Sequence, residues 1–187
     1  NVKSIIQTKD DLKAVEYRTG EYGVIISNLS GSRTLKKINK NYLEKDEEFV
    51  VISTVGNISN SDLTNVKTLE FLPNNDEDSL SHFSGDYTIA VNSYDDTQRI
   101  FYTTVSKDKL KISKDENGRE NIADIDITND SNWIEVKKGE VIPANAVAIA
   151  TIIDKIKVDE DVSFAYKIKP NGNHYGDTYV FNMNISS

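Results

Sequence analysis

Short runs in which apolar and polar residues alternate recur along most of this 187-residue chain. Alternation places every second side chain on one face of an extended strand, so each run predicts a strand with one buried face. Residues that favour turns, namely Asn, Asp, Gly, Ser and Pro, separate the runs. About ten strands in this order predict an all-β, immunoglobulin-like antiparallel β-sandwich rather than alternating strands and helices. The runs are EEFVVISTV (47–55), VKTLEFL (66–72), DYTIAV (86–91), QRIFYTTV (98–105), KLKIS (109–113), IADIDI (122–127), NWIEV (132–136), AVAIATII (146–153), VSFAYKI (162–168) and TYVFNMNI (178–185).

The composition is that of one folded, acidic domain. Hydrophobic residues make up 37% and charged residues 28% of the chain, within the range of globular proteins. The formal net charge of −8 argues against nucleic acid as a partner, because phosphate binding needs clustered lysine and arginine. The charge also disfavours anionic membranes, and no apolar run approaches the roughly 20 residues of a membrane helix. We expect neither a nucleic-acid partner nor membrane insertion.

The chain has no cysteine, so disulfides contribute nothing to its stability. Outside the cell such a chain depends on its core, on a metal or on another covalent link. The first residues lack the charged-then-apolar order of a signal peptide. For a secreted protein, we therefore expect the signal and the anchor to lie outside this sequence.

The segment LPNNDEDSLSHFSGDYTIAV (72–91) joins two predicted strands through an acidic loop. Pro73 ends the first strand because it cannot donate a hydrogen bond to a sheet. We expect Leu72, Phe83, Tyr87 and Ile89 to be structural. Two loop carboxylates, Asp76 and Asp78, are candidate calcium ligands, because hard oxygen ligands suit calcium and Asp95 and Asp96 sit at the next turn. The alternative is a solvated acidic loop without a cofactor.

The segment KDENGRE (114–120) looks like a calcium loop, with acidic residues before a glycine. An EF-hand loop carries Glu six residues after that glycine, where this chain has Asp124, and the flanking segments read as strands. Asn117-Gly118 therefore predicts a hairpin turn between two strands, since both residues tolerate positive φ.

A weak internal similarity bears on domain boundaries. YGVIISNLSGS (22–32) is similar to YGDTYVFNMNISS (175–187), as two closing strands would be. On this interpretation residues 1–31 end a preceding repeat and residues 32–187 form one complete repeat of a tandem array. In the alternative, residues 1–31 add a strand or two to the same sandwich.

The order of several elements between about Lys36 and Ile185 resembles the conserved-repeat immunoglobulin-like modules of Gram-positive wall-anchored proteins. The shared elements are TLKKIN, LEKDEE, FVVISTVGN, DLTNVKTLEFLP, the LPNND and FSGDY pair, IFYTT, Trp133 followed by IPANAVAIA, and YGDTYVFNMN. The loop departs from the family, which usually has Gly near Asn75 and Gly-Ser at Ser79 and Leu80. The resemblance implies an extracellular, cell-wall-anchored stalk or presentation module of an adhesin-like protein, with neighbouring repeats as partners.

Related surface domains often carry an isopeptide bond between a buried lysine and an asparagine. The reaction also needs a buried carboxyl group that stays protonated and polarises the amide, while burial keeps the lysine neutral. The resemblance places the lysine at Lys36 or Lys37 and the asparagine at Asn182 or Asn184; Glu70 is a candidate acid. Alternation puts Tyr179, Phe181, Met183 and Ile185 on one face of the last strand and both asparagines on the other. An inward asparagine would need a bulge or a strand buried on both faces, and ordinary strand residues are the alternative.

No catalytic residues are predicted, because the two histidines, His82 and His174, lie in turns without a second ligand-type residue at metal spacing. Trp133, the single tryptophan, is a core residue or, alternatively, a platform for stacking a sugar. We expect a non-enzymatic structural domain with a polar surface and no deep pocket. The alternative is an adhesin domain that grips a host extracellular protein or glycan through an exposed aromatic patch, with Tyr94, Tyr102 or Trp133 in it.

Overall fold

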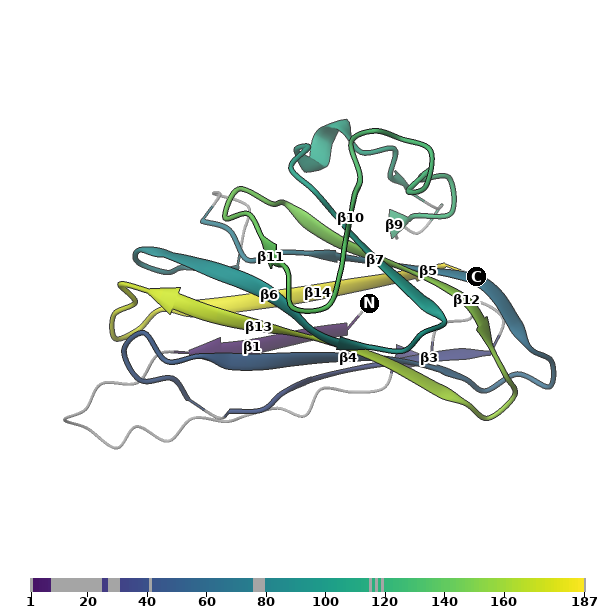
Figure 1. The fold of residues 1–187 in the computed structure, drawn as a ribbon, viewed down its shortest axis with the longest axis horizontal. Helices are drawn as coiled ribbons and strands as arrows, with labels where there is room; N and C mark the ends of the chain where they lie inside the picture. The colour runs from purple at the N-terminus through teal and green to yellow at the C-terminus, as the bar shows by residue number, and fades with distance from the viewer. Residues whose placement is uncertain are drawn as a thin grey trace.

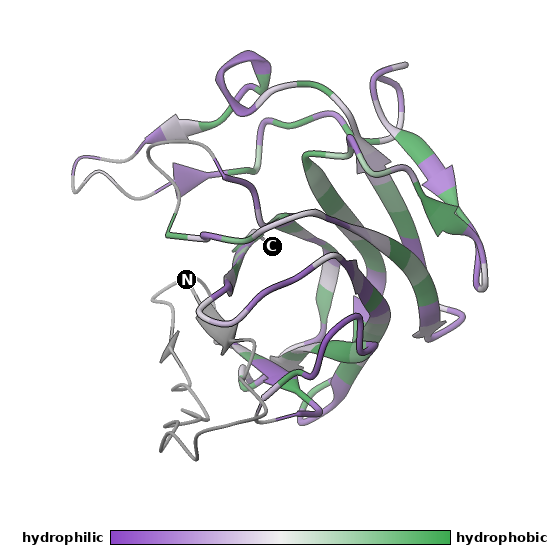
Figure 2. Cartoon of the chain, turned by 90° about the vertical axis from the view of Figure 1, so that its left-hand side faces the viewer, coloured by the Kyte–Doolittle hydropathy of each residue, from purple (hydrophilic) through white to green (hydrophobic). Residues whose placement is uncertain are grey.

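Two antiparallel six-stranded sheets pack face to face in the computed structural model (Figures 1 and 2), which describes residues 2–7, 25–26, 31–40, 42–75, 80–114, 116, 118 and 120–186. The prediction of an all-β sandwich is confirmed. The first sheet has the order β1 (Val2–Gln7), β14 (Thr178–Ser186), β5 (Leu63–Phe71), β12 (Ala148–Ile156), β7 (Gln98–Thr103) and β10 (Ile134–Val136). The second has the order β11 (Val141–Ile142), β6 (Asp86–Tyr94), β13 (Asp161–Asn171), β4 (Phe49–Asn57), β3 (Ser32–Ile38) and β2 (Ile25–Ile26).

Alternation along the strands builds the core between the two sheets. In β4, Phe49, Val51, Ser53 and Val55 are fully buried, and the residues that alternate with them are less so. The apolar side chains divide into a large cluster around Phe49, Tyr166 and Phe181 and a smaller one around Val55, Val66 and Ile153. Polar residues occupy the inward positions between the two clusters, which makes the middle of this core unusual.

Residues 104–133, which we call the excursion, cover part of the outer face of the first sheet (Figures 1 and 2). They include a short 3-10 helix, η1 (Lys107–Lys109), and a hairpin of β8 (Ser113–Lys114) and β9 (Glu120–Asn121). The β8–β9 pairing confirms that KDENGRE forms a hairpin, and its Asn117 lies outside the described residues. The flanking strands were predicted wrongly: only Ser113 of KLKIS lies in a strand, and IADIDI forms no strand. Trp133 is 6% exposed in an apolar cluster beneath the excursion, so its assignment to the core is confirmed.

The predicted structural residues of the 72–91 segment are confirmed. Leu72, Tyr87 and Ile89 are buried. Phe83 stacks on Tyr179 with ring centroids 4.7 Å apart, and the Tyr87 hydroxyl donates a hydrogen bond of 2.5 Å to the carbonyl of Pro73. The segment is therefore a strand–loop–strand joint anchored in the core.

Strands from the N-terminal 31 residues pair with both sheets. β1 pairs with β14, from Val2 opposite Met183 to Gln7 opposite Thr178, and β2 pairs with β3. This pairing is the arrangement of the alternative interpretation, in which residues 1–31 add strands to the sandwich formed by residues 32–187.

The start of β3 and the end of β14 lie at the same end of the sandwich, which we call the terminal pole (Figure 1). Ser32 is opposite Asn57 at the end of β4, and Ser186 is opposite Lys67 in the middle of β5. The other end, which we call the distal pole, carries the loops 39–48, 72–85 and 172–177. No helix within the described ranges is long and apolar enough to cross a membrane.

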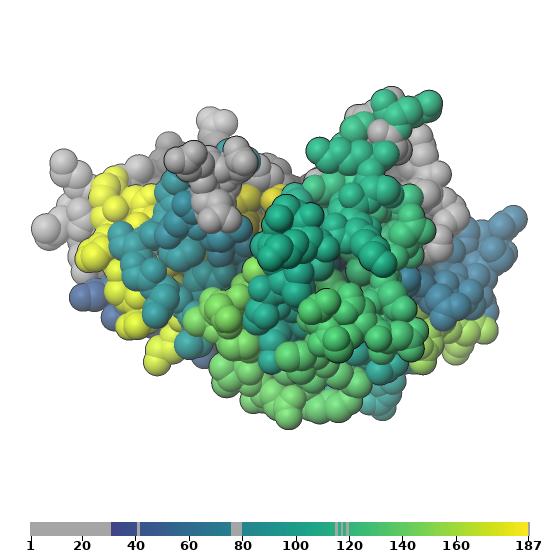
Figure 3. Space-filling model, turned by 90° about the horizontal axis from the view of Figure 1, so that it is seen from above, coloured from purple at the N-terminus to yellow at the C-terminus, as the bar shows by residue number. Residues whose placement is uncertain are grey.

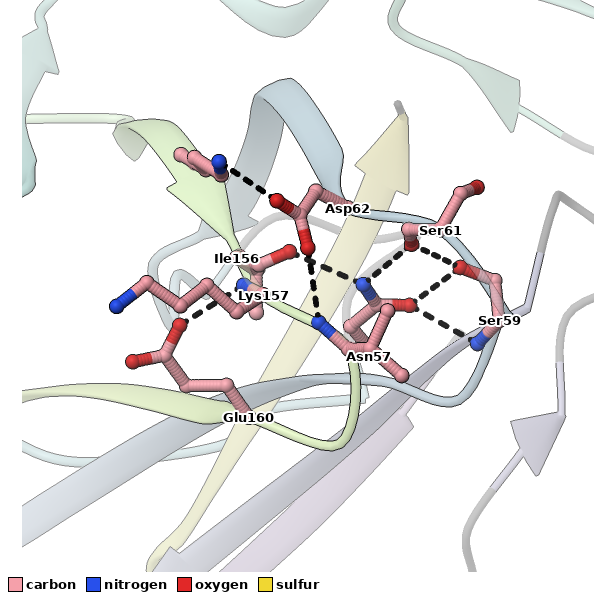
Figure 4. Close-up of polar contacts among 9 residues, drawn as sticks. Asn57, Ser59, Ser61, Asp62, Ile156, Lys157 and Glu160 are labelled. Atoms are coloured by element: carbon pink, nitrogen blue, oxygen red, sulfur yellow. Dashed lines mark hydrogen bonds and ion pairs between the residues drawn. The ribbon is translucent and has the colours of Figure 1, made fainter.

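Asn57 connects two loops at the terminal pole through its side chain (Figure 4). Its amide nitrogen donates to the carbonyls of Ser61 (2.8 Å) and Ile156 (3.0 Å). Its amide oxygen accepts from the backbone nitrogen (2.9 Å) and the hydroxyl (2.6 Å) of Ser59. Asp62 adds a second link, accepting from the Val158 nitrogen and pairing with Lys155 at 2.6 Å. The loops 58–62 and 157–160 are thereby held together.

Hydrogen bonds also connect the distal loops. Asp46 donates its backbone nitrogen to the Asn173 side chain and accepts from the Gly172 nitrogen, each at 2.6 Å. Asp177 accepts from Ser84 and from the backbone nitrogen of His174. The distal pole is therefore a preorganised set of loops.

Candidate functional site

A lysine–glutamate pair is buried between the sheets and is the most unusual chemical feature of the core. Lys36 lies on the inward face of β3 and is 2% exposed, whereas its neighbour Lys37 is exposed. Glu70 lies on the inward face of β5 in the opposite sheet, completely buried. The Lys36 Nζ and Glu70 Oε2 atoms are 2.5 Å apart. Two charges buried so deeply are rarely retained unless they are paired, and these two pair across the sandwich.

Tyr166 completes this site from β13. Its hydroxyl donates to Glu70 Oε2 at 2.7 Å, so one carboxylate oxygen receives both hydrogen bonds. The Lys36 Nζ lies 6.0 Å from the centroid of the Tyr166 ring and 5.7 Å from that of Phe181, where ring faces attract a cation. The other oxygen, Glu70 Oε1, has no hydrogen-bond partner within the described part of the chain.

Burial dominates the acid–base properties of the site. Removal from water lowers the pKa of Lys36 from its ordinary value, and the charge and hydrogen bond of Glu70 offset part of that effect. Burial raises the pKa of Tyr166 well above its usual value, and the neighbouring Glu70 charge adds to the increase. A lysine with a lowered pKa reaches its neutral, nucleophilic form more readily. The site thus holds a latent nucleophile next to a carboxyl group.

The structure brings together Lys36 and Glu70 but neither of the predicted asparagines. Met183 is opposite Glu70 in the β5–β14 pair, so the residue on the inner face of β14 at this level has no amide. Asn184 is opposite Leu69, and its amide donates at 2.8 Å to Glu120 of the excursion. Asn182 lines a groove on the same outer face. β14 is covered on both faces, as an inward asparagine would require, but both amides lie on the side away from Lys36.

The sequence pattern did not predict that Tyr166 belongs to this site, nor that further buried polar residues surround it. Alternation in VSFAYKI places Phe164 and Tyr166 on one face, which identifies Tyr166 as inward. The carboxylate that it contacts is 96 residues away in sequence, so nothing in the local pattern identifies that partner.

The calcium prediction stays a prediction, because its two candidate ligands, Asp76 and Asp78, lie outside the described residues. Asp95 uses its Oδ1 atom within its own turn, accepting from the Thr97 backbone nitrogen (2.9 Å) and hydroxyl (2.8 Å). These hydrogen bonds lower the pKa of Asp95. The described residues include no group of three or more side chains placed to hold a metal ion.

A groove of about 1040 Å³ lies on the outer face of the first sheet, between the excursion and the 72–87 joint. Seen from above in Figure 3, β14 is visible in yellow between the teal joint and the green excursion. The groove combines apolar and polar side chains and is open to solvent. Its members include Phe71, Leu80, Lys107, Leu110, Glu120, Asn145 and Asn182.

The charges that line the groove largely neutralise one another. Lys107 pairs with Glu120 at 2.6 Å and lies 4.4 Å from the centroid of the Phe71 ring. The floor strands are mostly paired: β5 pairs with β14 and β12, and β14 pairs with β1 from Thr178 to Met183 and with β5 from Asn182 to Ser186. Recognition in the groove would therefore rely on side chains.

The comparisons with known proteins give no family. No protein-family model matches the chain, and no curated protein matches it. A solved structure described as "AvmM Catalyzes Macrocyclization in Alchivemycin A Biosynthesis" is 12% identical over 84% of this chain and 78% of its own, with a TM-score of 0.29. A similarity this low supports no argument about fold or function.

Proposed function

We propose that this chain is a non-catalytic presentation domain of a bacterial cell-surface, adhesin-like protein, anchored to the cell wall. The ends of the predicted repeat at residues 32–187 carry the proposal. β3 begins and β14 ends toward the terminal pole, so neighbouring repeats joined to both would hold this repeat from one end. The distal pole, with its interlinked loops, would then project outward.

Two further properties support an extracellular structural role. The chain has no cysteine, so its stability rests on the large apolar core between the sheets rather than on disulfides. The net charge of −8 keeps such a domain soluble and discourages adsorption to anionic surfaces. Neighbouring repeats of the same protein are the proposed partners.

Antibodies against the purified domain test this proposal. We expect them to label intact cells of the source organism, and we expect brief protease treatment of those cells to remove the label. An antibody against a cytosolic enzyme is the control and should label only broken cells. Detection of the domain only after lysis would contradict a surface location.

The groove favours ligand binding as a second function, because the purely structural interpretation predicts a surface without a deep pocket. Its apolar faces and amides, beside charged residues of both signs, suit an oligosaccharide, whose rings have apolar faces and hydroxyl edges. A host peptide that adds a strand fits less well, since the floor strands are mostly paired on both edges.

Binding of the isolated domain to an array of glycans tests this second function. We expect Phe71→Ala and Asn182→Ala to abolish any binding that the domain shows. Lys169→Ala, an exposed position on β13 of the other sheet, is the matched control and should leave binding unchanged. Absence of binding across the array would leave the presentation role as the sole proposal.

A further inference from the structure

The core contains a polar belt between its two apolar clusters. In β4, Ser53 lies between Val51 of the large cluster and Val55 of the small one. In β12, Thr151 lies in the same way between Ile149 and Ile153. The belt consists of the inward residues Lys36, Ser53, Thr68, Glu70, Thr151 and Tyr166, each 2% exposed or less.

Four polar atoms of this belt have no hydrogen-bond partner within the described ranges. They are Ser53 Oγ, Thr68 Oγ1, Glu70 Oε1 and Thr151 Oγ1. Buried polar atoms in folded proteins are almost always hydrogen-bonded, either to protein or to ordered water. Each one left without a partner keeps the full desolvation penalty of its polar group. Four such atoms in one layer of a core call for a common explanation.

The strand register places these atoms close to one another. Thr68 and Thr151 are directly opposite in the β5–β12 pair, and Glu70 follows Thr68 on the same face of β5. Ser53 is directly opposite Lys36 in the β3–β4 pair, and Lys36 reaches across to Glu70.

We propose that the polar belt is an internal water-binding site, in which one or more buried water molecules bridge Glu70 Oε1 to the hydroxyls of Ser53, Thr68 and Thr151. A buried water makes about three hydrogen bonds, and the belt offers four otherwise unpartnered atoms. A metal cation is disfavoured although the atoms are hard oxygens. The Lys36 ammonium already neutralises Glu70, so a cation would leave a net charge in the core.

Two variants that keep the shape of the side chain distinguish a belt that contains water from one that does not. Thr68→Val and Thr151→Val each replace a hydroxyl with a methyl group. In a hydrated belt each removes a water partner, and we expect the unfolding equilibrium constant to rise about tenfold. In a dry belt each removes an unsatisfied hydroxyl, and the constant would stay the same or fall, which would overturn the proposal. Thr88→Val, at an exposed position of β6, controls for the preference of valine for strands.

Oxygen-17 magnetic relaxation dispersion of the unmodified protein gives an independent test. We expect a contribution from at least one water molecule with a long residence time. That contribution should decrease in the Thr68→Val/Thr151→Val double variant and persist in Thr88→Val. A wild-type profile without long-lived water, or one that the double variant does not change, would overturn the proposal even where the stability data are ambiguous.

Discussion

The protein has two buried polar centres, and their polar atoms find hydrogen-bond partners in different ways. Asn57 at the terminal pole is neutral, and both polar atoms of its amide are hydrogen-bonded, twice each, to nearby loop and strand atoms. The Lys36–Glu70 pair in the centre is charged, and both of its hydrogen bonds go to one carboxylate oxygen. The comparison shows that the amide joins two loops with little loss of free energy from desolvation, because its polar atoms are all hydrogen-bonded. The buried ion pair is stable only while both charged partners remain.

The largest effect should come from breaking the ion pair. Lys36→Met leaves the Glu70 charge buried without its partner, and we expect a loss of about 3–5 kcal/mol in the free energy of unfolding. Urea denaturation measures the loss. Lys37→Met, at the exposed neighbouring position, should change stability by at most about 0.5 kcal/mol.

A double variant tests whether the unpaired charge causes the loss of stability in Lys36→Met. Lys36→Met/Glu70→Leu removes both charges and should recover much of the stability lost in the single variant, because apolar residues of similar size replace buried ion pairs well. A double variant as unstable as Lys36→Met would show that packing, rather than the unpaired charge, determines the cost.

Asn57→Ala should have the next largest effect. It leaves the carbonyl of Ile156 and the backbone nitrogen of Ser59 without their side-chain partner, and we expect a cost of about 2 kcal/mol. Hydrogen exchange should become faster mainly in the loops 58–62 and 157–160, whereas Lys36→Met should accelerate exchange throughout both sheets. Asn60→Ala, exposed in the same loop, is the control. Equal acceleration everywhere in Asn57→Ala would remove the distinction between the two centres.

Tyr166→Phe should have a smaller effect, and that effect depends on pH. The variant loses one hydrogen bond to Glu70, which is worth about 1–2 kcal/mol at neutral pH. Because the folded pKa of Tyr166 is raised above the ordinary value of 10.0, the unfolded chain loses this proton first. The stability that Tyr166 contributes is therefore complete below pH 10 and declines as the pH rises above it. Urea denaturation between pH 8 and roughly 11 should show a steeper decline for wild type than for the variant; parallel curves would contradict the assignment.

The smallest expected effect is on the intact mass of the protein, which should match the sequence. The isopeptide reaction would remove one ammonia as the Lys36 amine displaces the amide nitrogen of an asparagine. Asn184 is bonded to Glu120 on the other side of β14, and Met183 faces Glu70. A mass lower by one ammonia would show that an asparagine reaches the inner face.

The sequence was sufficient to predict most of the fold but only part of the site. The period-two pattern identifies the long strands and the inward direction of Glu70, Phe181 and Met183, because alternation is a local property of extended chain. It also predicts that Asn182 and Asn184 point away from the core. The resemblance to other proteins supplied Lys36 or Lys37 as the lysine and the strand pattern supplied Glu70 as a candidate acid, but neither predicted the ion pair between Lys36 and Glu70.

The remaining features depend on contacts between distant segments. Ser53, Thr68 and Thr151 fit a strand pattern as well as any small polar residue, and only the packing of the two sheets makes them one belt. The groove likewise depends on how residues 104–133 fold back over the first sheet, and no local pattern specifies that path.

The positions at which β3 begins and β14 ends have a mechanical consequence if the repeat at residues 32–187 is pulled from both. Tension applied through the start of β3 and the end of β14 would enter and leave at one pole, so the long axis of the sandwich would carry little of the load. Strands pulled from a shared end peel apart one hydrogen bond at a time rather than sliding past each other all at once. The domain should therefore yield at low force from the terminal pole, and the Asn57 network would be the first part to give way, while the distal loops remain folded.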